Sequence, residues 1–365
     1  MANIKKFILL TTVIFLFISV TSNGQPIHES QTGMEENENP VRSLIAVGDI
    51  MMSGKMESFI IEKGADYPFK YTKEMIRSAD VAIGNLEAPL GPASDFKGPA
   101  DPTKTYTFLA SPKCADGIKN AGFDVLCLAN NHIMDFGARA LTSTVAILDS
   151  AGLIASGAGE NLEQARQPKI YSIDGYKIAF LSYSATYPKS FYATASRPGT
   201  AQARRNYIQK DVSIAAQQAD MVVVSFHWGQ ELLDYPKGYQ KDLARLAIDS
   251  GALLVIGHHP HILQGVEAYK NGVIAYSLGN FAFGSYSPNA KTSAALKVYF
   301  DQNGLKKAEL IPLIVDNFKV HFQTKIETGT AAEAILNEIV TLSKPFGTEI
   351  DVKNDIGVIS INKDK

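Results

Sequence analysis

The stretch Val255–Glu267, VIGHHPHILQGVE, places three histidines within four positions, although the whole chain contains only seven. The three follow an apolar run and a glycine, and a proline separates the last of them from the first two. A single histidine at the end of a strand is usually held by ordinary hydrogen bonds. Three together indicate a site that uses neutral imidazole nitrogens. This stretch therefore predicts a buried strand that ends in a functional site.

Predicted helices alternate with apolar strands on the N-terminal side of this stretch. The expected helices are 68–79, 111–122, 138–151, 204–219 and 238–251, and the expected strands are 43–49, 80–87, 123–132, 176–185, 220–229 and 252–261. Gly122 and Gly152 follow two of the helices, where a glycine commonly ends a helix. Strands that are apolar along their whole length are buried on both faces, so the pattern predicts a sheet covered by helices.

The pattern changes after His261. Strands are expected at 273–284, 293–300 and 306–315, with turns such as KNG and DQNG beside them, then a helix at 331–344 and a last strand at 355–361. Such close spacing favours an antiparallel sheet that completes the same domain. With 365 residues, 45% of them hydrophobic and 20% charged, the composition is that of a globular protein. The sequence predicts one α/β domain spanning residues 43–365.

The N-terminal segment has a different composition from the rest of the chain. Two lysines precede the apolar stretch Phe7–Val20, and small polar residues follow it, which is the order of a secretory signal peptide at 1–24. The alternative is an uncleaved membrane anchor, for which the apolar stretch is short. Residues 25–42 are polar and acidic and are expected to form a flexible linker. We therefore expect export to the periplasm or the cell surface, with the leader cleaved.

Cys114 and Cys127 are the only cysteines. Two cysteines in an exported protein can pair, but spacing alone does not place them within bonding distance. Cys127 lies in the apolar run DVLCLA, which favours a buried thiol. The net charge of −2 and a pI near 6.4 give no general attraction to nucleic acid, so any polyanion must be held by a local site.

Polar side chains gather where the predicted strands end, and ligands bind at such ends in open α/β sheets. These residues are Asp49; Asn85 and Glu87; Asn130, Asn131, His132 and Asp135; His227 and Glu231; and His258, His259 and His261, with Asn280 between two later apolar runs. Each alone has an ordinary explanation, such as a helix cap or a turn. Five of the seven histidines lie in these motifs, and this coincidence favours one shared site.

Aspartate, glutamate, asparagine and histidine together are the ligands of a hydrolytic metal site. Imidazole and carboxylate suit Mn, Zn or Fe, and the absence of thiolates from the motifs argues against a structural zinc site. Two metals about 4 Å apart that share a carboxylate activate water and hold a phosphoryl oxygen. The sequence therefore predicts one or two divalent ions bound at the strand ends.

The set and order of these motifs resembles the CapA family of capsule-synthesis proteins linked to poly-γ-glutamate. That family is similar to the calcineurin-like metallophosphoesterases. The resemblance extends from about Ser43 to about Gly284 and rests on GDIMMSG, GNLEAPL, LANNHIMDFG, FHWGQE, GHHPHILQGVE and YSLGNFAFG. It implies a four-layer α/β/β/α sandwich with the site at the strand ends.

The resemblance also implies a role for each motif residue. The implied metal ligands are Asp49, Glu87 in the bridging position, Asn131, His227, His259 and His261. His132 would face the leaving group, steadied by Asp135. Asn85, His258 and Asn280 would contact the substrate, and His258 is also a second choice as a ligand. The position two residues after Asp49, usually a histidine in phosphoesterases, is Met51, so one ligand is missing unless His258 or water replaces it.

Two functions follow from this resemblance. The first is an exported metal-dependent hydrolase of capsule or poly-γ-glutamate synthesis, which would act on an anionic polymer or a phosphoester and work with a membrane-associated capsule synthesis complex. The alternative is a non-catalytic protein of capsule assembly that binds a polyanion at a vestigial or single-metal site. Long loops follow Glu87 and Ala185, and such loops beside a site often act as lids. Lys189 and Arg197 in the second loop are expected to hold an anionic substrate.

Overall fold

The computed structural model describes residues 41–101 and 104–361. The predicted signal peptide and nearly all of the predicted linker lie outside these residues. The chain divides into two units after about Asn39, and all the described residues belong to the second. Strand β1, Arg42–Met51, begins one residue before the predicted start of the domain.

β1 lies near the middle of the larger of two sheets, which has ten strands. Parallel neighbours follow on one side in the order β2 (Val81–Leu86), β3 (Val125–Cys127) and β4 (Ile154–Ser156). Antiparallel neighbours follow on the other side in the order β14 (Thr292–Asp301), β15 (Gly304–Ile314), β18 (Ile356–Ile359) and β17 (Ile350–Lys353). Two short strands complete it: β13 (Asn280–Phe283), parallel to the end of β1, and β16 (Lys325–Ile326), beside β15.

The second sheet has six strands. Their order is β11 (Val266–Tyr269), β12 (Gly272–Ala275), β10 (Leu254–His258), β9 (Met221–His227), β7 (Tyr176–Ser184) and β6 (Lys169–Ile173). The four central strands are parallel, and the two edge strands are antiparallel to their neighbours. A separate pair is formed by β5 (Ala158–Gly159) and β8 (Gly199–Thr200).

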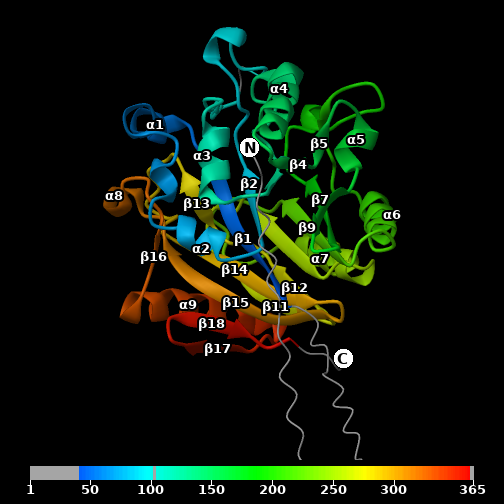
Figure 1. Cartoon of the computed structure of the whole chain (residues 1–365), viewed down its shortest axis with the longest axis vertical. Coiled ribbons are helices and arrows are strands. Elements are labelled where there is room, and N and C mark those ends of the chain that lie inside the picture. The colour runs from blue at the N-terminus through cyan, green and yellow to red at the C-terminus, as the bar shows by residue number, and fades with distance from the viewer. Residues whose placement is uncertain (1–40, 102–103, 362–365) are drawn as a thin grey trace, which may run out of the picture. The chain divides into compact units, whose positions relative to one another are not determined.

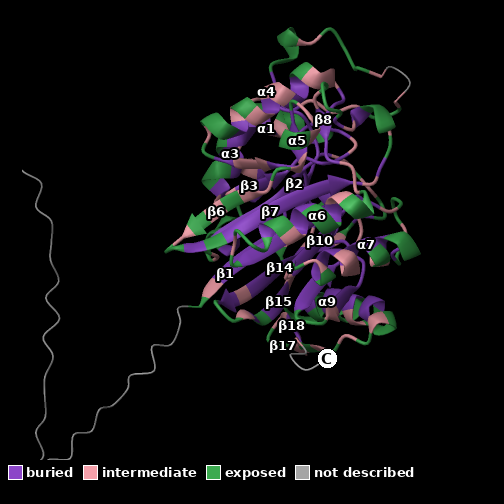
Figure 2. Ribbon diagram, turned by 90° about the vertical axis from the view of Figure 1, so that its right-hand side faces the viewer, coloured by how far each residue is buried: buried purple, intermediate pink, exposed green. Residues whose placement is uncertain are grey.

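The two sheets pack face to face, and the alternation of side chains on each strand decides which core they enter. On β1, Ala46 joins the core between the sheets, whereas Ile45 faces the helices outside. Phe180 and Ile256 of the second sheet pack into the core between the sheets. Each fully buried side chain of this size contributes about 1.5–3 kcal/mol. Figure 2 shows the central strands buried and the outer helix surfaces exposed.

Helices cover the outer face of each sheet. The larger sheet is covered by α2 (Lys73–Arg77), α3 (Cys114–Ala121) and α4 (Gly137–Ser150), and the smaller by α5 (Leu162–Arg166), α6 (Arg205–Ala215) and α7 (Gly238–Asp249). The remaining helices are α1 (Glu57–Lys63), α8 (Asn317–Val320) and α9 (Gly329–Ser343), the last of which packs on β15 and β11. The four-layer α/β/β/α sandwich expected from the sequence is confirmed (Figure 1). None of these helices has both the length and the apolar character that a membrane span requires.

Three sequence expectations were wrong in detail. Residues 68–79 form a 3₁₀ turn at Tyr67–Phe69 and the short α2, because Pro68 starts the turn and Thr72 leaves helical geometry. The expected strand 123–132 ends at Cys127. The expected strand 273–284 divides at Gly279, whose φ of +77° breaks the strand. Its halves, β12 and β13, enter different sheets and are parallel to β10 and β1, rather than antiparallel.

Both cysteines are free and buried, which decides between the two alternatives left open by the sequence. Cys114 packs in the core outside the larger sheet, and Cys127 packs in the core between the sheets. Burial raises the pKa of Cys114 to about 12 and that of Cys127 to about 11. Both thiols are therefore protonated and unreactive at neutral pH.

Gly48 allows β1 and β13 to approach each other closely at the site. A Cβ atom on Gly48 would lie 1.8 Å from the carbonyl oxygen of Gly279, which also accepts a hydrogen bond of 3.0 Å from the backbone N–H of Asp49. A side chain at Gly48 would thus push apart the two strands that carry Asp49 and Asn280.

We expect Gly48→Ala to lower the free energy of unfolding by about 1–3 kcal/mol, because the new methyl group forces the backbone of β13 to move. Denaturant unfolding of the purified variant measures this loss. Gly238→Ala is the matched control, since a Cβ atom at Gly238 meets nothing within 4 Å. Equal unfolding midpoints for Gly48→Ala and the wild type would contradict the prediction.

Candidate metal centre

The predicted site residues converge where the parallel strands of both sheets end. Asp49 lies near the end of β1, Glu87 follows β2, and His227 and His258 are the last residues of β9 and β10. All four are 2% exposed or less. Buried ionisable groups at this density are costly unless they are paired or bind a metal.

Asp49 is the most highly connected residue of the cluster. Its Oδ1 accepts a hydrogen bond of 2.8 Å from Asn85 Nδ2, and its Oδ2 accepts one of 3.2 Å from the backbone N–H of His259. The Nδ1 atoms of His258 and His261 lie 3.1 Å from Oδ1 and Oδ2, respectively. Burial opposes the charge, but the two histidines hold the pKa of Asp49 well below its usual range. Asp49 is therefore a carboxylate.

Glu87 carries an unsatisfied acceptor at the centre of the cluster. Its Oε1 has no hydrogen-bond partner and lies 3.5 Å from His227 Nε2 and 3.7 Å from His261 Nε2. Burial and the neighbouring charge of Asp49 raise the pKa of Glu87 well above its usual value. Burial alone would lower the pKa of His261, but the charges of Glu87 and Asp49 outweigh it and raise that pKa to about 10. Without another positive charge among these carboxylates, Glu87 and His261 both bind protons more tightly than usual.

Two other histidines are neutral. Burial lowers the pKa of His227 well below its usual value, and burial together with the charge of His261 lowers that of His259 to about 3. His227 Nε2 lies 2.6 Å from Asn131 Oδ1, so the predicted amide ligand faces the same point. His259 Nδ1 has no hydrogen-bond partner. Neutral imidazole is the form that ligates metal.

The backbone of the histidine motif is held in an unusual conformation. His259 has a φ of +94° and His261 a φ of +61°, on either side of Pro260. Residues other than glycine rarely adopt such angles, and each costs about 1–3 kcal/mol. This conformation turns both rings toward Glu87 and Asp49. The stored strain indicates a functional requirement at this turn.

The cluster fits a divalent metal ion. Asp49, Glu87 and His227 form one group whose ligand atoms lie within 4.8 Å of one another, and Glu87, His259 and His261 form a second. Glu87 belongs to both groups, as a bridging carboxylate does in a two-metal site. Its unsatisfied Oε1 and the free Nδ1 of His259 are the buried atoms that a cation would satisfy.

A second assembly borders the cluster. His132 Nδ1 lies 2.8 Å from Asp135 Oδ2, which also accepts a hydrogen bond of 2.8 Å from the backbone N–H of Phe108. Lys104 forms an ion pair with Asp135, and its Nζ lies 3.0 Å from His132 Nδ1. The His132 Nδ1 atom therefore faces both an acceptor, Asp135 Oδ2, and a donor, Lys104 Nζ, and the two contacts favour opposite ring tautomers. Burial lowers the pKa of His132, which favours the neutral ring.

Lys104 and Asn130 take part in this arrangement, although the sequence did not identify their roles. Lys104 lies in the long loop after Glu87 that was predicted to be a lid, and it also donates to the backbone carbonyl of Asn131. Asn130 Nδ2 donates to Asn85 Oδ1 at 3.1 Å, and its Oδ1 accepts from the backbone N–H of His132 at 3.1 Å. Asn130 therefore joins the two assemblies.

A cavity of about 690 Å³ opens beside the cluster. Met51, His132, His261 and Asn280 line it, and Asn280 Oδ1 lies 2.9 Å from His261 Nδ1. Met51 is fully buried and presents only a thioether where the resemblance implies a histidine. His258 lies next to Asp49, but neither of its ring nitrogens makes a well-aligned hydrogen bond.

The predicted substrate residues Lys189 and Arg197 are not among the residues that line this cavity. Lys189 is exposed in the 3₁₀ turn Lys189–Phe191, near the ring of Tyr187. Arg197 is also exposed and donates to the backbone carbonyl of Tyr192. Their binding of substrate stays a prediction.

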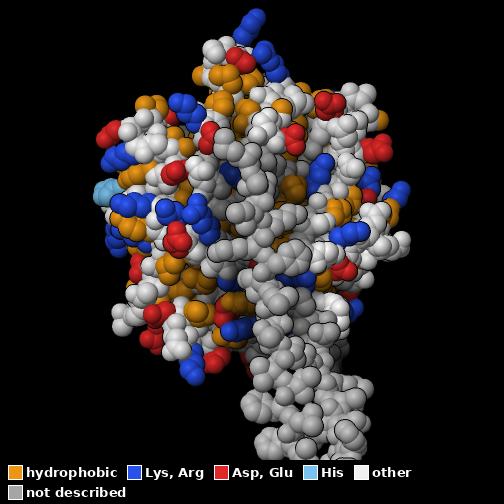
Figure 3. Space-filling model, viewed as in Figure 1, with side chains coloured by type: hydrophobic (Ala, Val, Ile, Leu, Met, Phe, Trp, Pro, Cys, Tyr) orange, Lys and Arg blue, Asp and Glu red, His pale blue; other side chains and the backbone are white. Residues whose placement is uncertain are grey.

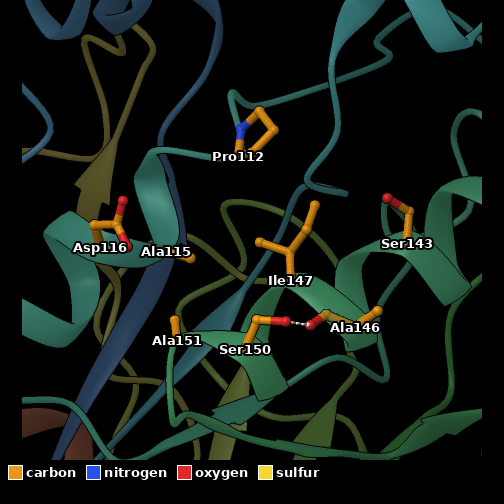
Figure 4. Close-up of a pocket in the computed structure, with 8 residues that line it drawn as sticks. All are labelled: Pro112, Ala115, Asp116, Ser143, Ala146, Ile147, Ser150 and Ala151. Carbon is orange, nitrogen blue, oxygen red and sulfur yellow. Dashed lines mark hydrogen bonds between the residues drawn. The ribbon is translucent and has the colours of Figure 1, made fainter.

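Another pocket, of about 340 Å³, lies between α3 and α4 on the outside of the larger sheet. Figure 4 shows its lining, in which Asp116 is the only ionisable side chain. No histidine, lysine or arginine lines it, so its one carboxylate has no basic partner in the pocket. The chemistry of the described residues therefore concentrates at the strand ends.

Comparison with known proteins gives this site a family context. The family described as bacterial capsule synthesis protein PGA_cap matches residues 43–285. The capsule biosynthesis protein CapA of Bacillus anthracis is 33% identical over 289 residues, 78% of this chain and 70% of that protein. The PGA biosynthesis protein CapA of Bacillus subtilis strain 168 is 35% identical over 274 residues, 75% of this chain and 71% of that protein.

Among solved structures, the 5'-nucleotidase precursor of Thermus thermophilus is similar with a TM-score of 0.46 and 14% identity, over 84% of this chain and 59% of that one. The match to PGA_cap covers all of the motifs at the strand ends, and both CapA relatives exceed 30% identity over most of this chain. The chain therefore belongs to the PGA_cap family of bacterial capsule synthesis proteins.

Proposed function

We propose that the protein is an exported metal-dependent hydrolase that cleaves a phosphoester or a related bond during the synthesis of capsule or another anionic surface polymer. One observation carries this proposal: six side chains from five strand ends meet at one place, where the Oε1 atom of Glu87 is unsatisfied, and the His132 assembly lies beside them. The printed names of the CapA relatives support the link to capsule synthesis.

Six residues would hold the metal. They are Asp49, Glu87, Asn131, His227, His259 and His261. A divalent ion bound there would acidify water and offset negative charge on the substrate. The mixture of imidazole, carboxylate and amide, without thiolate, suits Mn, Zn or Fe. The sharing of Glu87 between two groups favours two ions.

The residues of the chain supply the proton and the orientation. His132 borders the cavity, and in the tautomer that accepts from Lys104 at Nδ1 it can donate its Nε2 proton to the leaving oxygen while Nδ1 takes a proton from Lys104, so the ring stays neutral. Asp135 fixes the ring and the lysine together. Asn280 orients His261, and Asn85 orients Asp49, so both act as positioning residues unless substrate reaches them directly.

A second candidate function is the non-catalytic binding of a polyanion in capsule assembly, around a single metal. The specific observation that favours it is Met51. Its thioether occupies the place of an expected imidazole and is a poor ligand for Mn or Zn. A membrane-associated capsule synthesis complex is the expected partner in either function.

Metal content tests the proposal. We expect the purified protein to carry about one to two metal ions per chain after Mn or Zn is supplied, and His259→Ala/His261→Ala to lose them. In the same samples the wild type should turn over an aryl phosphodiester, and His259→Ala/His261→Ala should not. His321→Asn is a matched control, because His321 also has a positive φ and lies outside the site.

The outcomes separate the candidate functions. Metal without turnover of any tested phosphoester would favour polyanion binding. A wild-type protein that stays free of metal after Mn and Zn have been supplied would show that the histidine cluster is structural, and the proposal would then be wrong.

A further inference from the structure

A strip of lysine and aromatic side chains continues from the cavity across one face of the protein. We name it the lysine–aromatic strip and define it as Lys55, Lys63, Lys70, Lys319 and Lys325 with Phe59, Tyr67, Tyr71, Tyr286, Phe318 and Phe322. These residues come from the segment around α1 and α2 and from the segment around α8 and β16. Figure 3 shows lysine and hydrophobic side chains side by side over α1, α2 and α8, on the left of the view.

The strip is continuous with the cavity. Lys55 and Tyr286 line the cavity themselves. The ring of Tyr286 lies 4.9 Å from that of Phe322, which lies 5.2 Å from the ring of Phe59. Phe59 in turn stacks on Tyr67 at 5.6 Å. Phe322 is 1% exposed, so it packs beneath the surface and holds the rings at the mouth of the cavity against those of α1, while at the surface the exposed ring of Phe318 lies 4.9 Å from Tyr286.

The outer end of the strip carries positive charge over aromatic faces. Lys63 Nζ lies 5.5 Å from the Phe59 ring centre and 5.2 Å from that of Tyr67. Lys70 and Lys325 lie 5.2 Å and 4.9 Å from the ring centre of Tyr71. Among the described residues, none of these three lysines forms an ion pair with a carboxylate.

The charge of these segments is positive, in contrast to the net charge of −2 of the whole chain. Residues 54–77 and 316–326 contain seven lysines and arginines and five aspartates and glutamates. Asp316 is buried as the N-cap of α8, whereas the other four carboxylates are exposed, so the seven basic side chains outnumber the exposed carboxylates. The outward surface therefore favours an anionic ligand.

The aromatic residues favour a chain rather than a small anion. Phe318 is 60% exposed, Tyr71 46% and Tyr286 41%, and the rings of Phe318 and Tyr286 lie 4.9 Å apart, so these two form a contiguous exposed patch. A polymer that carries its carboxylates on methylene groups would cover these rings with the methylene groups and place its charges beside the lysines. An anionic membrane would also suit such a mixture, but continuity with the cavity favours a chain that enters the site.

We propose that the lysine–aromatic strip binds an extended polycarboxylate chain and guides it into the cavity at the metal centre. This inference rests on the proposed function, because the strip leads to that site. One segment of the bound polymer lies in the site, and the adjoining segments of the polymer lie on the strip. Affinity therefore increases with polymer length, and it decreases with salt because the charges are exposed to solvent.

The test uses Lys63→Gln/Lys70→Gln/Lys325→Gln in the metal-loaded full chain. We expect its affinity for long poly-L-glutamate, measured by fluorescence anisotropy, to decrease about tenfold, because each exposed charge contributes little alone. Triglutamate, too short to cover the strip, should bind both proteins equally. The control Lys177→Gln/Lys210→Gln/Lys353→Gln removes three exposed lysines from β7, α6 and β17 and should retain wild-type affinity.

Metal content and turnover of an aryl phosphodiester are measured on the same proteins, so failure of the proposed function is recognised separately. If both triple variants lost the same polymer affinity, the loss would reflect the overall charge of the protein and not the strip, and the proposal would be wrong. Unchanged polymer affinity in Lys63→Gln/Lys70→Gln/Lys325→Gln would also overturn it. If Lys63→Gln/Lys70→Gln/Lys325→Gln lost binding to phosphatidylglycerol vesicles but kept polymer binding, the strip would be a membrane-binding surface and the proposal would also be wrong.

Discussion

Glu87→Gln should abolish tight metal binding and turnover. Glu87 belongs to both candidate metal groups, and its Oε1 lies within 3.7 Å of His227 and His261 without a hydrogen-bond partner. Glutamine has the same size but carries no charge, so it cannot bridge two cations. Elemental analysis after dialysis measures the loss of metal, and initial rates on an aryl phosphodiester measure the loss of turnover.

The same variant should flatten the pH dependence of stability of the metal-free protein. The pKa of Glu87 is raised well above its usual value and that of His261 is raised to about 10, so the folded state keeps protons that the unfolded state has released. The stability of metal-free wild type must therefore fall as the pH rises from about 7 to about 9. Glu87→Gln removes one of these two titrating groups and also removes the largest cause that raises the pKa of the other, His261.

Thermal unfolding in chelator at several pH values measures this effect. Glu231→Gln is the matched control, because Glu231 also lies near the cavity but belongs to neither metal group. It should keep its metal and change the pH slope less than Glu87→Gln does, because the charge of Glu231 is among the smaller causes of the raised pKa values of Glu87 and His261. A Glu87→Gln protein that retains both metals and turnover would contradict the assignment of Glu87 as the shared ligand.

The strand ends could be predicted because burial leaves a clear pattern in the sequence. Continuous apolar runs before Asp49, His227 and His258 indicate strands covered on both faces, and polar residues at their ends have few structural uses. The set and order of the motifs carry the family resemblance, and that resemblance predicted the four-layer architecture. Residues 273–284 also form one apolar run, but a positive φ at Gly279 divides them between two sheets. Such a division depends on register and leaves little trace in the pattern.

The His132 assembly shows what the sequence alone could not supply. Asp135 is three residues from His132, so their contact could be expected, whereas Lys104 is 28 residues away in a Pro- and Gly-rich loop. Only the path of that loop brings Lys104 Nζ within 3.0 Å of the ring. Lys189 was chosen for its charge and loop, and the structure places it on the exposed surface. The sequence therefore predicts that a lysine from a long loop takes part in the site, but only the fold shows which lysine reaches it.

His132→Gln should lower kcat on an alkyl phosphodiester by about two to three orders of magnitude while metal content stays at the wild-type level. Loss of a general acid typically has an effect of this size. His132 is absent from both candidate metal groups, and its ring is held by Asp135 and Lys104. Glutamine removes the ring proton but keeps a polar side chain of similar length in the same place.

The leaving group decides whether His132 acts as the acid or only supports the site. An alkyl leaving group needs a proton, whereas a nitrophenolate leaves without one. The ratio of wild-type to variant kcat should therefore be large for alkyl esters and shrink toward one for 4-nitrophenyl esters. Lys104→Met should show the same dependence in weaker form, because it removes only the donor to Nδ1. A defect of equal size for both leaving groups would show that His132 positions the site without transferring a proton.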